Sequence, residues 1–249
     1  MQDFSCILGN KKIYETDKGV HTLETFRQLF EAISIFRLNE MPFVIISLVV
    51  GFTVHEFAHA YVAYRFGDHT AKDQGRLTLN PAQHLDPIGT LLLLIAGFGW
   101  ARPVPVQRSR FKNPKLAGIL VSLAGPLSNF LVAFIAYALF FFFIGVSGFA
   151  VPSFIVNLLQ MMVYLNVLLF VFNLIPVPPL DGYRVIEDLA PPHVRSKMSQ
   201  YEQYGALIFI VLVITPLGNY TIRPLLFNGI AAVNQTFNSI FTAIYSLFS

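Results

Sequence analysis

The sequence is poor in cysteine and in charged side chains. Its 249 residues include one cysteine, Cys6, which excludes an intrachain disulfide framework and a zinc site built from several cysteines. Asp, Glu, Lys and Arg together make up 12% of the residues, about half of their share in an average soluble domain. The net charge of +3 is too small and too dispersed to indicate binding of nucleic acid. A metal ion bound by this chain would therefore use histidine and carboxylate ligands.

The low share of charged residues is matched by a high share of apolar ones. They account for 55% of the sequence, and phenylalanine alone contributes 25 residues. A soluble fold must present a polar exterior, and a core of this size cannot absorb so much apolar surface. The composition therefore excludes a water-soluble globule and a disordered chain, and it predicts a protein that lies in a lipid bilayer.

Four apolar segments are long enough to cross a bilayer, which takes about 20 residues of helix. They cover residues 42–66, 116–144, 153–175 and roughly 204–222. A fifth segment, 88–100, has only about a dozen apolar residues between glycines, so we expect a re-entrant or short buried element there. We therefore predict an all-α, polytopic bundle of four to five transmembrane helices.

We expect three parts along the chain: a leader over 1–41, a membrane domain over 42–222 and an apolar C-terminal helix over 223–249. In the leader, apolar residues between Leu23 and Phe36 recur at three- and four-residue spacing. This spacing is typical of an amphipathic helix, either on the membrane surface or packed against the bundle. The C-terminal helix carries many Asn, Thr and Ser residues, and it either spans the membrane or lies at the interface.

Ten of the 17 lysines and arginines lie in two connecting segments, 67–115 and 176–203, whereas the loop near 145–152 is uncharged and the five basic residues of the leader are balanced by six acidic ones. The positive-inside rule places the basic segments on the cytoplasmic side and the N-terminus outside. Within the first of them, Leu77 and Leu79 alternate with polar residues, and the prolines of 102–107 indicate a second extended edge. A β-hairpin element is therefore expected between the first two core helices.

The first predicted span contains the run His55-Glu56-Phe57-Ala58-His59 near its basic end. Ionisable side chains are costly inside a membrane helix and indicate a functional site there. Residues four apart share one helix face, so His55 and His59 can bind one metal ion together. Glu56 can then reach a water molecule at that ion. The alternative is a polar patch buried against neighbouring helices.

Two histidines do not complete such a site, because a catalytic zinc usually takes three protein ligands. Asp181 is the candidate for the third ligand. It follows the third predicted span in a segment whose three prolines end the helix and hold the backbone extended at membrane depth. The alternative for Asp181 is a helix N-cap in a solvated loop.

The two motifs resemble those of the site-2 protease family of intramembrane zinc metalloproteases. The second motif, N-x-x-P-x-P-x-L-D-G, is matched from Asn173 to Gly182, and the similarity covers about residues 42–215. The sequence is similar to the small members, which lack PDZ and CBS domains. The resemblance implies a three-helix core with one Zn²⁺ on His55, His59 and Asp181, below the cytoplasmic surface of a prokaryotic plasma membrane. It also implies hydrolysis of a peptide bond within or beside a transmembrane segment of a membrane-protein substrate.

The same resemblance extends to Ala124-Gly125-Pro126-Leu127-Ser128-Asn129 in the second predicted span. It implies that Asn129 faces the site, where an amide can position the substrate or stabilise an oxyanion. The alternative is an interhelical hydrogen bond that serves packing alone.

In the expected reaction, Glu56 takes a proton from the attacking water and passes it to the leaving amine. Two extended segments, 75–80 and 102–107, are expected to flank the substrate, because an open strand edge can pair with an extended peptide. For His84, near the first of them, a local hydrogen bond is favoured over a place at the metal. Two alternatives from other classes are a zinc-binding transporter and a catalytically inactive membrane scaffold. A transporter usually shows paired halves, and none is visible here.

Overall fold

The structure is a computed structural model, and it describes residues 36–96, 99–146 and 150–247. The amphipathic helix predicted between Leu23 and Phe36 lies outside these residues, apart from its last position. The chain divides into two compact units, residues 1–42 with 86–101 and residues 43–85 with 102–249. All of the predicted site residues belong to the second, larger unit.

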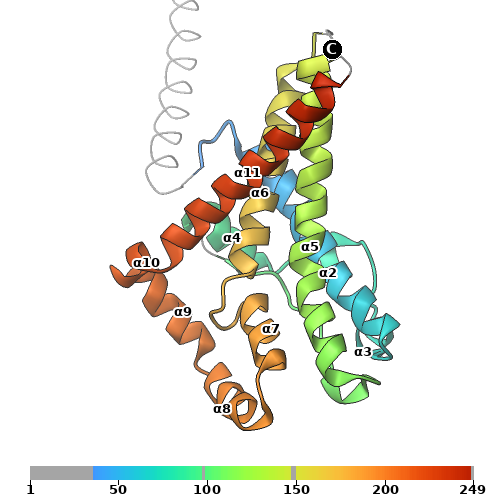
Figure 1. Cartoon of the computed structure of the whole chain (residues 1–249), viewed down its shortest axis with the longest axis vertical. Helices are drawn as coiled ribbons and strands as arrows, with labels where there is room; N and C mark the ends of the chain where they lie inside the picture. Colours follow the sequence, from blue (N-terminus) through green and yellow to red (C-terminus); the bar gives the residue numbers. More distant parts are fainter. Residues whose placement is uncertain (1–35, 97–98, 147–149, 248–249) are drawn as a thin grey trace, which may run out of the picture. The chain divides into compact units, whose positions relative to one another are not determined.

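Three helices of the described chain are long and apolar enough to cross a membrane, judged by length and composition. They are α2 (Met41–Arg65), α5 (Pro114–Phe141) and α6 (Ser153–Asn173), and Figure 1 shows α5 and α6 side by side. A π-helical turn, η3 (Phe142–Val146), continues α5. Three of the four predicted spans are therefore present as helices of spanning length.

The start of α5 follows from its sequence. Asn113 caps the helix, because its side-chain oxygen accepts a hydrogen bond from the Leu116 N–H at 3.3 Å. Pro114 occupies the first helical position, where the missing N–H costs nothing.

The fourth predicted span, 204–222, is not a single helix. The chain forms α9 (Gly205–Ile214), α10 (Leu217–Tyr220) and then α11 (Ile222–Ser246). Thr215 adopts an extended conformation with φ −86° and ψ 162°, because the Pro216 ring disfavours helix at the residue before it. With ten residues, α9 is about 15 Å long, half the thickness of the bilayer core. The predicted total of four to five transmembrane helices is therefore not confirmed.

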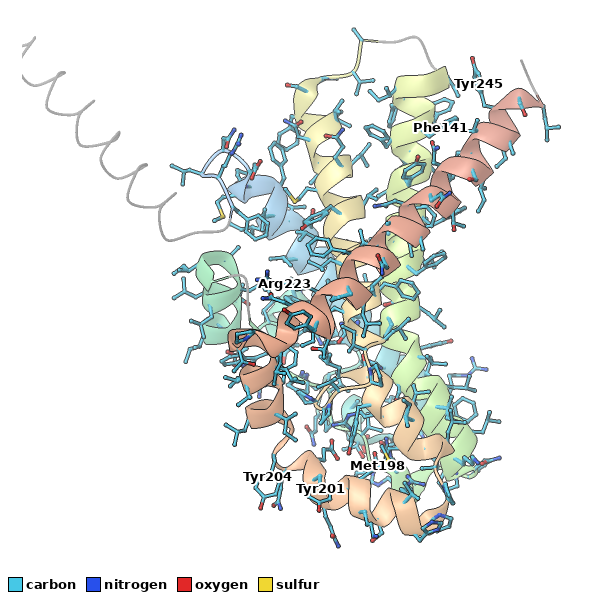
Figure 2. The ribbon with its side chains drawn as sticks, turned by 60° about the vertical axis from the view of Figure 1, so that its left-hand side comes forward. Phe141, Met198, Tyr201, Tyr204, Arg223 and Tyr245 are labelled. Carbon is cyan, nitrogen blue, oxygen red and sulfur yellow. The ribbon has the colours of Figure 1, made fainter. Side chains whose placement is uncertain are left out.

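The C-terminal helix α11 has 25 residues but is not among the three apolar spans. It packs on α5 and α6 through aromatic rings. Phe237 is fully buried in a cluster with Ala133 and Val167, and Figure 2 shows Phe141 of α5 near Tyr245 of α11, with ring centroids 6.2 Å apart.

The segment 88–100 contains one short helix, α4 (Pro87–Ala96), whose ten residues are too few to cross a membrane. The shortness of α4 agrees with the prediction, whereas its re-entrant or buried course stays a prediction. The β-hairpin is not confirmed, since the described residues form no strand. Between α2 and α5 the larger unit has α3 (Thr70–Asp73) and two 3-10 turns, η1 (Pro81–Gln83) and η2 (Arg108–Arg110).

The two segments expected to form the hairpin nevertheless lie next to each other. The Arg76 guanidinium donates hydrogen bonds to the carbonyl oxygens of Arg102 at 2.6 Å and of Pro103 at 3.2 Å. The Arg102 N–H donates to the His84 carbonyl oxygen at 2.8 Å. A buried arginine side chain thus joins the segments where strand pairing was expected. Two further helices, α7 (Asp181–Leu189) and α8 (Pro192–Glu202), follow α6.

Candidate metal centre

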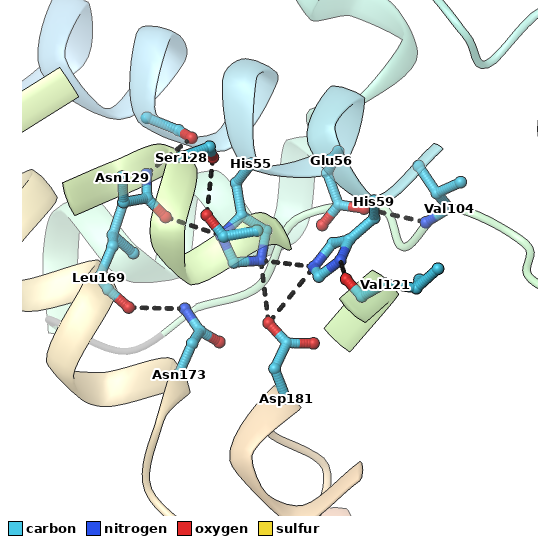
Figure 3. A network of polar contacts seen from close by, with 12 residues as sticks. His55, Glu56, His59, Val104, Val121, Ser128, Asn129, Leu169, Asn173 and Asp181 are labelled. Atoms are coloured by element: carbon cyan, nitrogen blue, oxygen red, sulfur yellow. Dashed lines mark hydrogen bonds and ion pairs between the residues drawn. The ribbon is translucent and has the colours of Figure 1, made fainter. Parts of the chain in front are cut away.

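His55 and His59 lie four residues apart on the buried face of α2. Both residues are less than 9% exposed, and their Nε2 atoms are 3.0 Å apart. The spacing that predicted one shared face therefore places both imidazoles at one point, as Figure 3 shows.

Asp181 reaches the same point as the first residue of α7. Its Oδ2 atom lies 3.2 Å from His55 Nε2 and 3.3 Å from His59 Nε2. The helix that carries Asp181 starts tight against the end of α6, because a Cβ atom at Gly182 would lie 2.3 Å from the Leu174 carbonyl oxygen. Glycine is therefore required beside Asp181 to bring the carboxylate to the histidines.

The three converging atoms fit a tetrahedral metal ion. Zn²⁺ at about 2.0–2.1 Å from its ligands separates neighbouring ligand atoms by about 3.3 Å. The observed separations are 3.0, 3.2 and 3.3 Å. Three ligands from the protein leave a fourth position of the tetrahedron for water or substrate.

The second nitrogen of each imidazole is bound by an oxygen acceptor. His55 Nδ1 lies 2.7 Å from the Asn129 side-chain oxygen, and His59 Nδ1 lies 2.6 Å from the Val121 carbonyl oxygen. Each Nδ1 therefore carries the proton, and each Nε2 directs a lone pair toward Asp181. Asp181 Oδ2 is itself buried without a hydrogen-bond donor among the described residues. Three acceptor atoms in such contact form a ligand set that fits a cation between them.

Asn129 lies at the site, as predicted, but its amide group is already fully used. It is fully buried, and its NH₂ group donates to the Gly51 carbonyl oxygen and to the Asn166 side-chain oxygen, both at 3.0 Å. With its oxygen on His55, Asn129 has no free donor for an oxyanion in this arrangement. The contacts favour a role in orienting His55, and the predicted catalytic role stays a prediction.

Asn166 of α6 is a residue of this network that the sequence analysis missed. It is fully buried, and its amide NH₂ group donates to the Met162 carbonyl oxygen at 2.9 Å. A polar amide within an apolar span was the signal that could have identified it, because such a group needs a partner on a neighbouring helix.

Glu56 is also buried, and it contacts the segment 102–107. Its carboxylate accepts a hydrogen bond from the Val104 N–H at 2.9 Å. Figure 3 shows this carboxylate beside the His59 ring. The residue predicted to act as the base therefore lies between the histidines and the segment predicted to flank the substrate.

Gly125 of α5 faces the two histidines. A Cβ atom at this position would lie 2.3 Å from His59 Nε2 and 2.6 Å from His55 Nε2. These distances are far below van der Waals contact, so only glycine lets α5 approach the imidazoles this closely.

Asp68 fixes the far end of the segment 102–107 to the end of α2. Its carboxylate accepts hydrogen bonds from the hydroxyl and N–H of Thr70 and from the Gln107 N–H. Burial acts to raise the pKa of Asp68, but these hydrogen bonds and the nearby Arg110 charge outweigh it, and the pKa falls below its ordinary value.

His84 is fully buried away from the metal ligands. Its Nε2 lies 2.7 Å from the Thr78 carbonyl oxygen. The expected local hydrogen bond is therefore present.

Comparison with known proteins places the chain among peptidases. The family described as peptidase family M50 matches residues 147–216. The chain is 54% identical over 209 residues to the "Putative zinc metalloprotease YwhC" of Bacillus subtilis, which covers 83% of this chain and 95% of that protein. It is 32% identical over 183 residues to the "Putative zinc metalloprotease Rip2" of Mycolicibacterium smegmatis, covering 71% of this chain and 68% of that protein. No solved structure matches the chain significantly.

Proposed function

The chain belongs to peptidase family M50, the site-2 protease family, and from this premise we propose that it is an intramembrane zinc metalloprotease. Its substrates are membrane proteins, cleaved within or beside a transmembrane segment. The observation that carries the proposal is the convergence of His55, His59 and Asp181 on one point at the spacing of zinc ligands. An apolar helix supplies two of these ligands, which supports a reaction below the membrane surface.

The buried residues of the site divide the chemistry between them. His55, His59 and Asp181 would hold the zinc ion, which would supply a Lewis acid for the scissile carbonyl and for a bound water molecule. The Glu56 carboxylate takes the proton from the attacking water and passes it to the leaving amine. Asn129 and the Val121 carbonyl oxygen keep the two imidazoles in the tautomer that binds metal.

The segments 75–80 and 102–107 are proposed to flank the substrate. A peptide bond in a transmembrane helix is already hydrogen-bonded, so the substrate must unwind locally before attack. The Arg102 and Pro103 carbonyl groups already accept from Arg76, and prolines 103 and 105 have no N–H. A bound extended peptide would therefore pair with the remaining backbone groups of this segment, next to Glu56.

The protein is proposed to lie in the prokaryotic plasma membrane with its site toward the cytoplasm. His59 is six residues before the end of α2, which is about 9 Å along the helix axis. The basic residues of the loops that follow α2 and α6 support the cytoplasmic assignment of that end.

Replacing Glu56 by Gln tests the reaction. Wild type and the E56Q variant are co-expressed with a panel of single-span membrane proteins, and full-length and cleaved products are compared by immunoblot. We expect E56Q to accumulate full-length substrate while it retains zinc in the purified protein. A transporter or a scaffold has no need of this carboxylate, so unchanged activity in E56Q would contradict the proposal.

Replacing Asp181 by Ala tests the third ligand. Zinc content is measured in the purified wild type, in Asp181→Ala and in the control Asp73→Ala, which removes an exposed carboxylate. We expect zinc to be lost in Asp181→Ala and retained in the control. Undiminished zinc in Asp181→Ala would remove this residue from the site.

A further inference from the structure

A second group of charged side chains lies at the other end of the helix that begins with Asp181. Glu187 and Asp188 occupy the last turn of α7, and Arg108 of η2 reaches both of them. Its guanidinium donates to Glu187 Oε2 at 2.8 Å and lies 3.0 Å from Asp188 Oδ2. Arg195 of α8 lies 2.8 Å from the other Asp188 oxygen. Two cations thus enclose two adjacent carboxylates.

The two carboxylates depend on these cations because both are removed from water. The Asp188 side chain has no exposed surface, and Glu187 has 4%. Burial raises the pKa of Asp188, and the charges of Arg108 and Arg195 oppose this effect. A buried charged side chain that loses its partner strongly destabilises the folded protein. Moving the end of α7 away from Arg108 would therefore cost free energy, because it would leave buried carboxylates without a cation.

The fit around Asp188 is also sterically tight. A Cβ atom at Gly118 of α5 would lie 2.3 Å from Asp188 Oδ2. The end of α7 is therefore held between α5 on one side and the arginines on the other. Because α7 is a helix of nine residues, fixing Glu187 and Asp188 in its last turn also fixes its first residue, about 10 Å away along the helix axis.

Arg108 also follows directly on the segment 102–107, which contacts Glu56. It lies four residues after Val104, whose N–H contacts Glu56, and one residue after Gln107, whose N–H contacts Asp68. One arginine thus links the segment that contacts Glu56 to the helix that carries Asp181.

We propose that Arg108 is a positioning residue of the metal centre. By holding the last turn of α7, its guanidinium sets the place of Asp181 against His55 and His59. This inference rests on the proposed function, since it takes Asp181 as a zinc ligand. The ion pairs of Arg108 join it to Glu187 and Asp188 and not to the metal ligands, so its effect passes through α7.

The test measures zinc affinity of the full-length protein in detergent micelles, by competition with a chelator of known affinity. The variants are Arg108→Gln and Arg108→Lys, and Arg184→Gln is the control. Arg184 lies on α7, the helix that carries Asp181, and pairs with Glu202 at 3.0 Å, but this pair is partly exposed. Loss of support for a metal ligand typically weakens metal binding about 10- to 100-fold. We expect this loss in Arg108→Gln, a partial recovery in Arg108→Lys, and the wild-type affinity in Arg184→Gln.

A purely structural ion pair would change the melting temperature of the zinc-free protein without changing the zinc affinity of the folded protein. The melting temperature is therefore recorded for each variant. If Arg108→Gln does not fold, Glu187→Gln is added to remove the buried charge that has lost its cation, since Asp188 keeps Arg195, and the zinc affinity of the double variant must still fall. Wild-type affinity in a folded variant without Arg108 would overturn the inference.

The two proposals can fail separately. If Asp181→Ala binds zinc as wild type does, the assignment of the metal ligands fails, and the role of Arg108 fails with it. If Asp181→Ala loses zinc while folded Arg108→Gln retains the wild-type affinity, only the role of Arg108 is overturned.

Discussion

At the scale of single residues, the metal centre depends on a position that has no side chain. Gly125 allows α5 to pass so close to α2 that any Cβ atom would meet the two imidazole nitrogens. Alanine favours a helix over glycine by about 1 kcal/mol, so a Gly→Ala change in a helix would ordinarily stabilise it. At Gly125, the better helix propensity of alanine would stabilise the protein, whereas the steric clash of its Cβ atom would destabilise it. The clash falls directly on His55 and His59, the proposed metal ligands.

We therefore predict that Gly125→Ala abolishes zinc binding and proteolysis. Zinc content and substrate cleavage are measured in the purified variant. The matched control is Gly229→Ala in α11, where the added Cβ would meet methyl groups of Val171, which can move more easily than a metal ligand. A Gly125→Ala protein with a full complement of zinc would contradict the close approach of α5.

A second residue-scale prediction concerns acid stability. The folded state lowers the pKa of Asp68 below its value of about 3.9 in an unfolded chain. Its ionised form therefore stabilises the folded protein above about pH 4, and this contribution is lost as the pH falls through the lowered pKa. In Asp68→Asn, an NH₂ group would replace one carboxylate oxygen and would face a backbone N–H that then lacks its acceptor. We therefore expect the free energy of unfolding to fall by about 1–3 kcal/mol near pH 7.

The measurement is the thermal unfolding midpoint in detergent micelles between pH 7 and pH 3. Asp68→Asn should melt lower than wild type at pH 7 and lose less of its stability on acidification. Asp73→Asn, at an exposed carboxylate, serves as the control and should follow wild type. Equal acid dependence in wild type and Asp68→Asn would contradict the assigned hydrogen bonds.

At the scale of elements, a layer of amide groups joins the three long helices. Asn129 of α5 donates to a carbonyl oxygen of α2 and to Asn166 of α6, and it accepts from His55 of α2. Each helix therefore contributes a polar group to one buried network next to the metal ligands. Such interhelical hydrogen bonds in membranes average about 0.6 kcal/mol each.

We predict that Asn166→Leu lowers the free energy of unfolding by about 1 kcal/mol. It should weaken zinc binding less than Asp181→Ala does, because His55 keeps its contact with Asn129. The thermal unfolding midpoint and the zinc affinity are measured together. Asn157→Leu is the control, since Asn157 is exposed on the same helix. An unchanged midpoint in Asn166→Leu would show that the layer adds nothing to helix association.

Features that depend on residues close together in the sequence were predicted better than features that depend on residues far apart in it. The paired histidines and the three long apolar helices follow from local spacing and composition, and both are present in the structure. The break of the fourth span could also have been predicted locally, because Pro216 lies within the apolar run. Asp181 is 122 residues beyond His59, so no local pattern connects the two. Its assignment rested on the need for a third zinc ligand and on the family resemblance.

Other features of the site depend on contacts that no local pattern encodes. The pairing of Arg108 with Glu187 and Asp188 joins loops and helices far apart in the chain. The contacts of Arg76 with the Arg102 and Pro103 carbonyl oxygens take the place of the strand pairing that alternation and prolines had indicated. In both cases the sequence shows the residue types, whereas the fold decides their partners.

At the scale of the whole molecule, the charge distribution decides which side of the membrane holds the metal centre. Exposed lysines and arginines gather where α2 ends and α5 begins, and these ends pack together through Ala63, Phe111 and Ala117. They include Arg65, Lys72, Arg110, Lys112 and Lys115. The start of α6 carries none of these charges. Translocating the basic end would oppose the positive-inside rule, so we expect it to remain in the cytoplasm.

Cysteine labelling tests this orientation. Cys6 is replaced by Ser, and single cysteines are placed at two exposed positions, Lys112 before α5 and Ser153 at the start of α6. In intact cells stripped of their wall, a membrane-impermeant maleimide should label Ser153→Cys directly and Lys112→Cys only after permeabilisation. The reverse pattern would place the metal centre toward the outside, where the substrate's cleaved fragment would be released away from the cytoplasm. Because α5 connects the two positions through an apolar helix of 28 residues, labelling of both from the same side would contradict a spanning α5.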